Sequence, residues 1–114
     1  MNFSFEQGRD AWVNAYYLGN VQQLQQYEAE DLLIHYQASG IDESCINRYN
    51  QIQHAVENAM WRPQKLDIVA EEFEFSDDFH HCLVRLRDAQ DRILVEEKWR
   101  NHSGLWQIYR LTIF

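Results

Sequence analysis

The spacing of apolar residues changes abruptly at Pro63, the single proline of the chain. Before it, apolar side chains such as Phe5, Trp12 and Tyr16 recur at steps typical of an amphipathic helix. After it, apolar and polar residues alternate in four runs separated by short polar breaks, which indicates an antiparallel strand meander. The chain is therefore predicted to be an α+β domain with its helices first and most of its strands last.

Capping residues divide the first half into three predicted helices. Gly19 can adopt the left-handed conformation that ends a first helix, and Asn20 can cap a short second one. Ser44 can cap a third helix, which Pro63 is expected to end.

The strands are predicted from alternation and from β-prone residues. Residues 32–36 form a short apolar run that favours a strand, whereas residues 38–43 are interpreted as a loop. Four further strands are predicted over residues 65–75, 79–87, 92–100 and 105–114.

Both faces of the predicted meander carry apolar residues. Strict alternation in the last strand places Trp106 and Ile108 on one face and Leu105, Leu111 and Ile113 on the other. Three helices can cover only one face, and a large exposed apolar surface usually marks an interface. We therefore expect a homodimer packed through the sheet face. The alternative is a monomer in which long polar side chains shield that face.

Length, composition and charge narrow the classes of function. The 114 residues suit one domain, residues 1–114, and an apolar content of 46% is too high for a disordered chain. A net charge of −8 repels phosphate backbones and anionic lipids, so neither a nucleic acid nor a membrane is an expected partner. The chain shows neither a membrane-spanning run nor the pattern of a signal peptide, which predicts a cytoplasmic protein. Cys45 and Cys82 form no paired motif and are expected to be buried free thiols.

Two short motifs and the order of the elements carry a family resemblance. Gly19-Asn20 precedes the second helix, and the run 104–108 reads Gly-Leu-Trp-Gln-Ile. With these motifs nearly the whole chain resembles the nuclear transport factor 2-like superfamily, in particular its small bacterial branch of ketosteroid isomerase-like and SnoaL-like proteins. The resemblance implies three N-terminal helices on a curved, mostly antiparallel sheet, a cone-shaped cavity that often holds an apolar small molecule, and dimers formed through the sheet.

The catalytic residues of that branch do not carry over. Ketosteroid isomerase-like members use a tyrosine on the first helix and an aspartate on the first strand. Here Trp12 stands at the tyrosine position, and His35, or Tyr36 in a register one residue later, stands at the aspartate position. His35 remains a candidate base near neutral pH, although the more apolar phase of its strand predicts that it turns outward.

Two carboxylates are sharper candidates for acid–base chemistry. Glu71 and Glu97 each fall in phase with the apolar face of a predicted strand. Burial there would raise the pKa of a carboxyl toward a range useful for catalysis. The alternative is that each points outward, or is neutralised by Arg85, Arg87 or Arg110 in a structural ion pair.

Aromatic side chains are expected to converge between the helices and the sheet, where they would line a ligand cavity or simply fill the core. The five candidates are Trp12, Tyr16, Tyr36, Tyr49 and Trp99. No cofactor is indicated, and no metal site is expected because His80 and His81 are strand neighbours that point to opposite faces.

Two hypotheses of function follow. The first is a dimeric small-molecule-binding protein with an apolar cavity, including an enzyme of isomerase, cyclase, dehydratase or hydrolase type that uses Glu71, Glu97 or His35 as its acid–base group. The second is a non-catalytic interaction domain whose exposed sheet face binds a partner chain.

Overall fold

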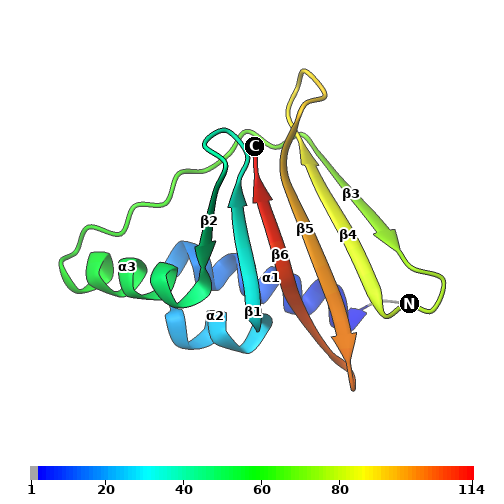
Figure 1. Ribbon diagram of the computed structural model, residues 1–114, viewed down its shortest axis with the longest axis horizontal. Helices are drawn as coiled ribbons and strands as arrows, with labels where there is room; N and C mark the ends of the chain where they lie inside the picture. Colours follow the sequence, from blue (N-terminus) through cyan, green and yellow to red (C-terminus); the bar gives the residue numbers. More distant parts are fainter. Residues whose placement is uncertain (1–2) are drawn as a thin grey trace.

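The computed structural model describes residues 3–114, and it describes side chains from Phe5 onward. Within that range three helices and six strands follow one another, as Figure 1 shows. Their bounds are α1 Phe3–Leu18, α2 Val21–Tyr27, β1 Glu28–Tyr36, β2 Ile41–Ser44, α3 Cys45–Glu57, β3 Ala70–Phe75, β4 His81–Arg87, β5 Ile93–His102 and β6 Leu105–Ile113. The strands form one sheet in the order β2-β1-β6-β5-β4-β3. The predicted α+β class is therefore confirmed.

The sheet joins the two halves of the chain. Strands β3 to β6 pair antiparallel with their sequence neighbours, which confirms the predicted meander. Strand β1 then pairs parallel with β6, and β2 pairs antiparallel with β1 at the edge of the sheet. The strands fan out in Figure 1, and α1 crosses behind them.

The predicted helix signals at the start of α2 and α3 are present. Gly19 adopts a φ of 70°, in the left-handed region, and so ends α1. The side chain of Asn20 accepts a hydrogen bond from the backbone N–H of Gln23 at 3.1 Å. The hydroxyl of Ser44 accepts one from Asn47 at 3.3 Å, so both residues cap their helices as predicted.

Several predicted boundaries are wrong. The segment interpreted as a loop contains strand β2, in which Ile41 pairs with Tyr36 of β1. Helix α3 ends at Glu57, well before Pro63, because the chain leaves the helix at Asn58 and Ala59 takes a positive φ of 54°. Residues 60–69, here called the strap, then run without regular secondary structure from α3 to β3. The strand predicted over residues 65–75 therefore begins only at Ala70.

A β-bulge in β6 changes which side chains face the helices. Trp99 of β5 pairs with Ile108, but its neighbour Lys98 pairs with Arg110, which leaves Tyr109 as an extra residue. The extra residue shifts the alternation, so Leu111 joins Ile108 among the buried residues.

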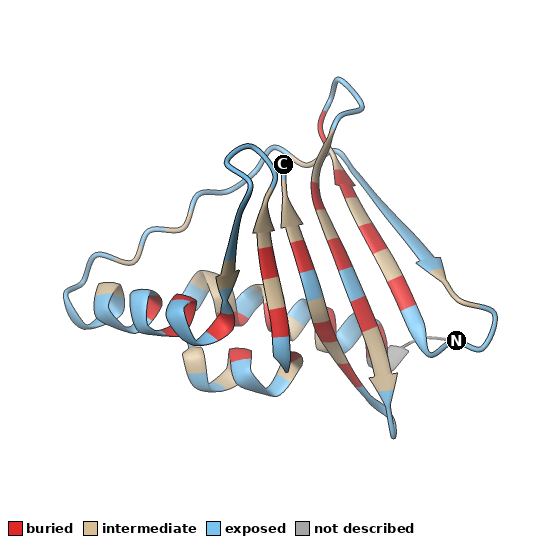
Figure 2. Ribbon diagram, viewed as in Figure 1, coloured by how far each residue is buried: buried red, intermediate tan, exposed pale blue. Residues whose placement is uncertain are grey.

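The prediction that Leu111 and Ile113 lie on the opposite face from Trp106 is therefore wrong, because it assumed strict alternation through the strand. Leu105, which precedes the bulge, is 48% exposed and Leu111 only 6%. Figure 2 shows the alternation of buried and less buried residues along the strands.

The opposite, outer face of the sheet is rich in charged side chains. Arg85 lies 3.7 Å from Glu74 and 3.6 Å from Glu96, across three neighbouring strands. Arg100 of β5 donates to Asp31 at 2.7 Å. The face thus carries the long polar side chains that were the alternative to an apolar interface. The homodimer itself stays a prediction.

All three helices pack against one face of the sheet. Phe5 of α1, Leu24 of α2 and Ile52 of α3 belong to the same buried cluster as Val84 of β4 and Trp99 of β5. Burying such side chains is the main source of stability for a domain of this size. The face of the sheet that packs against this core is called the inner face, and a ligand site can form there.

Two smaller expectations concern the cysteines and the membrane. Cys45 and Cys82 are both buried free thiols, as predicted. Burial raises the pKa of the Cys82 thiol to about 11, which disfavours the reactive thiolate. Over residues 3–114, no helix has the length and apolar character needed to cross a membrane.

Candidate ligand-binding cavity

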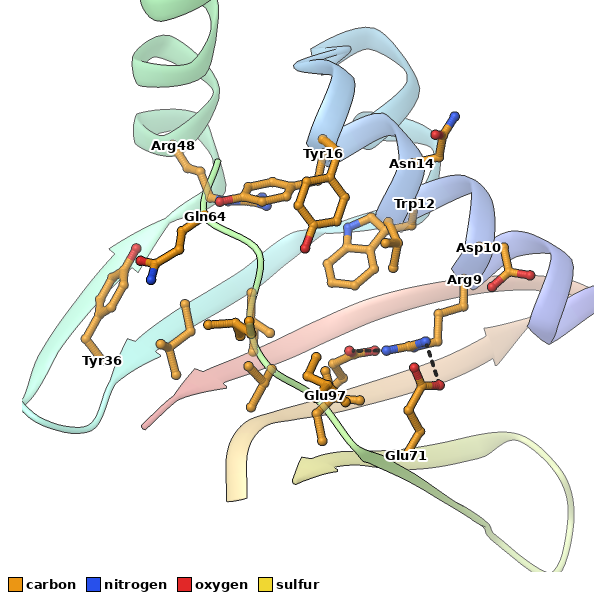
Figure 3. A pocket seen from close by; sticks show the side chains of 18 residues that line it. Arg9, Asp10, Trp12, Asn14, Tyr16, Tyr36, Arg48, Gln64, Glu71 and Glu97 are labelled. Carbon is orange, nitrogen blue, oxygen red and sulfur yellow. Dashed lines mark hydrogen bonds and ion pairs between the residues drawn. The ribbon is translucent and has the colours of Figure 1, made fainter. Parts of the chain in front are cut away.

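A cavity of about 550 Å³ lies between α1, α3, the strap and the inner face of the sheet. Figure 3 shows the side chains that line it. Its apolar wall includes Trp12, Val13, Leu86, Val95, Leu111 and Ile113. The Tyr109 bulge matters here, because it is what turns Leu111 and Ile113 toward this space.

A buried ion pair lies at the β5 end of the cavity. Arg9 of α1 donates from Nε and Nη2 to the two carboxylate oxygens of Glu97, each at 2.8 Å. Trp99 Nε1 donates to the same carboxylate at 2.8 Å, and Glu97 is 1% exposed. Burial opposes the charge of Arg9, but its bonds and attraction to Glu97 outweigh this and raise its pKa. Three N–H donors therefore fix the position of the Glu97 carboxylate.

Glu71 of β3 lies next to this pair, and its carboxylate is accessible from the cavity. Its carboxylate lies 3.6 Å from Arg9 Nη1, beyond hydrogen-bond length, and its side chain is 47% exposed. No hydrogen bond to Glu71 occurs among the described side chains, from Phe5 to Phe114. Of the two candidate carboxylates, Glu71 is the one that a ligand could reach.

A second buried carboxylate lies behind Trp12. Glu28, at the start of β1, accepts hydrogen bonds from Trp12 Nε1 at 2.7 Å, Arg48 Nη1 at 2.8 Å and the Tyr49 hydroxyl at 2.6 Å. Glu28 is 3% exposed. Burial, and then the hydrogen bond to Glu28, raise the pKa of Tyr49. This network fixes α1 and α3 to the first strand.

Arg48, Tyr16 and Tyr36 gather at the α3 end of the cavity. The guanidinium carbon of Arg48 lies 5.2 Å from the centre of the Tyr16 ring, in a cation–π contact. Burial raises the pKa of the Tyr16 hydroxyl, and the charge of Arg48 partly offsets the rise. The Tyr36 hydroxyl donates to Glu43 at 2.8 Å, and burial together with this bond raises its pKa to about 12.

Five of the eight predicted site residues line the cavity: Trp12, Tyr16, Tyr36, Glu71 and Glu97. The other three do not. Tyr49 lies behind the wall against Glu28, and Trp99 is fully buried in the core. His35 bonds Asp42 at 2.7 Å, and it is not among the residues that line the cavity.

The partners expected for the carboxylates also differ from the prediction. Arg85 and Arg87 belong to the outer face, where they pair with other carboxylates. Arg110 bonds backbone carbonyls instead. The residue that neutralises Glu97 is Arg9, which comes from the first helix.

Sequence reasoning missed the two arginines of the site. Arg9 follows Phe5 by one helical turn and precedes Trp12 by another, so it interrupts the apolar stripe of α1. Arg48 stands next to Tyr49 in α3. A charged residue inside an apolar stripe was the available signal in α1. No group of His, Cys, Asp or Glu side chains within the described part of the chain is arranged to hold a metal ion.

Comparison with known proteins gives structural matches alone, because no protein-family model and no curated protein matches the chain. An NTF2-like protein from Cytophaga hutchinsonii aligns with a TM-score of 0.70 at 13% identity, over 98% of this chain and 97% of the other. A Shewanella frigidimarina protein described provisionally as a ketosteroid isomerase aligns with a TM-score of 0.65 at 11% identity, over 97% and 94%. The S. rosetta CaMKII hub aligns with a TM-score of 0.68 at 8% identity, over 96% and 92%.

The three structures have different names, and their identities to this chain are low, so the likeness concerns the fold. It agrees with the Gly19-Asn20 turn and with the run 104–108 that carried the resemblance. The chain has the nuclear transport factor 2-like fold.

Proposed function

We propose that the chain binds one small, mainly apolar molecule in the cavity. The observation that carries this proposal is an open space of about 550 Å³ with apolar walls and a few polar groups at its two ends. Small-molecule sites commonly have volumes of roughly 300–1,000 Å³ and this kind of lining. Trp12 and Tyr49, which are large enough to fill such a space, both donate to Glu28.

Neighbouring residues on opposite faces of β6 offer a matched test. Leu111 lines the cavity, whereas Thr112 follows it and faces outward. The neutral fluorescent probe N-phenyl-1-naphthylamine should bind the native chain saturably. Leu111→Trp fills the space and should weaken binding by about tenfold or more, which corresponds to about 1.4 kcal/mol. Thr112→Trp should bind as the native chain does.

Thermal denaturation establishes that both variants fold. Native-like probe binding by a folded Leu111→Trp variant would show that the probe sits elsewhere and would overturn the proposal. The same conclusion follows if the native chain shows no saturable binding of apolar probes.

For chemistry in this cavity, we propose Glu71 as the acid–base group. Glu97 already accepts from three donors, and His35 is not part of the lining. Glu71 keeps a carboxylate that no described side chain hydrogen-bonds, and the Arg9 guanidinium lies 3.6 Å away.

The proposed role of Glu71 requires its carboxyl to contact the molecule in the cavity. Carbon NMR of the side-chain carboxyls should show a chemical-shift change for Glu71 when the probe is added, and none for Glu72, its neighbour on the outer face. Glu71→Gln identifies the resonance. A Glu71 resonance that does not respond to the probe would exclude this role.

The alternative role, an interaction domain that uses the outer sheet face, has weaker physical support. Docking there would desolvate Arg85 with Glu74 and Glu96, and desolvating paired charges rarely gives a net gain. Since a cavity stands on the opposite face, ligand binding is the better-supported function.

A further inference from the structure

We infer that the ligand of the cavity carries a carboxylate, and that Arg48 receives it at the α3 end. This inference rests on the proposed function and adds the chemical class of the ligand. It follows from the unused donors of Arg48, from the way Glu28 is already satisfied, and from the uneven charge along the cavity.

Arg48 has donors left over. Its side chain is 10% exposed and lines the cavity, yet one nitrogen alone, Nη1, has a hydrogen-bond partner among the described side chains, which is Glu28 at 2.8 Å. A guanidinium carries five N–H donors in a planar fork that matches a carboxylate. No buried side-chain nitrogen or oxygen in the described residues lacks a partner, so the remaining Arg48 donors are accessible rather than sealed in the core.

Glu28 does not depend on Arg48 alone. Trp12 Nε1 and the Tyr49 hydroxyl both donate to it, at 2.7 and 2.6 Å. These two neutral donors stabilise the carboxylate but add no positive charge. Arg48 is therefore held in place by Glu28 while part of its fork remains free for a second anion.

The neighbours of Arg48 suit a carboxylate. Its guanidinium stacks 5.2 Å from the Tyr16 ring centre, and the Tyr16 hydroxyl bonds no group among the side chains from Phe5 onward. Gln64 of the strap lines the same end, and Figure 3 shows it between Arg48 and Tyr36. The Tyr36 hydroxyl already donates to Glu43, so Tyr36 offers mainly its ring.

Charge along the cavity sets the orientation of such a ligand. At the far end two carboxylates offset the charge of Arg9, because Glu97 accepts two hydrogen bonds from it and Glu71 lies 3.6 Å from its Nη1. Asp10 adds a further negative charge to the lining there. A carboxylate is repelled from that end and attracted to Arg48. The apolar body of the ligand then lies along Val95 and Leu111.

A series of matched compounds tests the inference by calorimetry. 4-Phenylbutyrate is ionised at neutral pH, whereas 4-phenylbutyramide has the same shape without the charge. The native chain should bind the acid about tenfold to a hundredfold more tightly than the amide, since hydrogen bonds to charged groups are the stronger ones.

The double variant Glu28→Gln/Arg48→Met removes the buried pair together, so no unpaired charge remains. It should lose the preference for the acid but still bind the amide. Glu71→Gln should bind the acid more tightly than the native chain because a repulsive charge is gone. Arg100→Met, which removes an arginine of the outer face, should change neither affinity.

Arg48→Lys keeps the charge without the fork and should weaken acid binding while keeping some preference. Equal binding of acid and amide by the native chain would overturn the carboxylate inference and leave the cavity proposal intact. So would an unchanged preference in the folded double variant. Failure of every compound, together with failure of the neutral naphthylamine probe, would overturn both proposals.

Discussion

Arg9 and Glu97 are joined by two parallel hydrogen bonds, from Nε to Oε1 and from Nη2 to Oε2, each 2.8 Å long. Both residues are buried, so removing one partner leaves an uncompensated charge in the core. We predict that Arg9→Met lowers the free energy of unfolding by about 3–5 kcal/mol in urea denaturation. Arg9→Met/Glu97→Met should recover most of that loss. A single variant as stable as the native chain would contradict the prediction.

The bulge at Tyr109 predicts unequal roles for two leucines of β6. Leu111 is 6% exposed and Leu105 is 48% exposed, although strict alternation would place them on the same face. Leu111→Ala should cost about 2 kcal/mol or more, the range for truncated core residues. Leu105→Ala should stay within about 0.5 kcal/mol of the native chain, as surface changes do. Equal losses in denaturant titrations would mean that the strand alternates without the bulge.

Gly19 and Gly40 separate backbone strain from packing. Both have a φ of 70°. A methyl group added to Gly19 would lie 2.5 Å from Val56 Cγ2 and 2.9 Å from Trp61 Cδ1, whereas a methyl group added to Gly40 would meet no atom within 4 Å. Gly40→Ala should cost about 1–2 kcal/mol for the left-handed backbone alone. Gly19→Ala should cost about 1–3 kcal/mol more, because the methyl group overpacks its neighbours. Thermal or urea denaturation should therefore show that Gly19→Ala is less stable than Gly40→Ala. The reverse order of stability would contradict the packing argument.

Tyr36 links stability to alkaline pH. Burial and its bond to Glu43 raise its pKa to about 12, whereas an unperturbed tyrosine loses its proton near about pH 10. Because the folded pKa is the higher one, this stabilisation is fully present below about pH 10 and is lost as pH rises toward 12. Tyr36→Phe should make the alkaline decline in stability less steep. An ultraviolet titration should show one fewer late-ionising phenol in this variant, and an unchanged titration would contradict the assignment.

The homodimer expected from the sequence would pack through the outer face of the sheet, so it carries the same desolvation cost for Arg85 with Glu74 and Glu96 as any other partner. Each copy has a net charge of −8, so two copies repel each other and added salt screens that repulsion. Sedimentation at micromolar concentration should give a mass near twice 13.8 kDa, and added salt should favour the dimer. Arg85→Glu adds negative charge to the face and should weaken the dimer. A mass of 13.8 kDa under all conditions would exclude it.

Local signals in the sequence predicted much of the fold. Gly19, Asn20 and Ser44 act through their own backbone and nearest turn, so their roles can be inferred from a few residues. Strand β2 and the bulge at Tyr109 depend instead on which partner strand lies alongside. Residue type does not report that partner, which is why both were missed.

In the candidate site, too, the features set by local sequence could be predicted and those set by distant partners could not. The apolar phase of the strands placed Glu71 and Glu97 toward the helices, and both line the cavity. Their relation to Arg9 could not be inferred, because Arg9 and Glu97 lie 88 positions apart in the chain. The outward orientation of His35 could also be predicted, because the more apolar residues of its strand occupy the alternate positions.

The parallel pairing of β1 with β6 has a consequence for synthesis on the ribosome. Asp31 and Arg110, on these two adjacent strands, are 79 positions apart, so β1 emerges long before the strand that completes it. Until β6 appears, the nascent chain exposes an unpaired strand edge, and such edges attract other chains. Long-range pairing of this kind also slows folding. The helices and β2 can form early. The exposed edge of β1 is covered only when β6 pairs between β1 and β5.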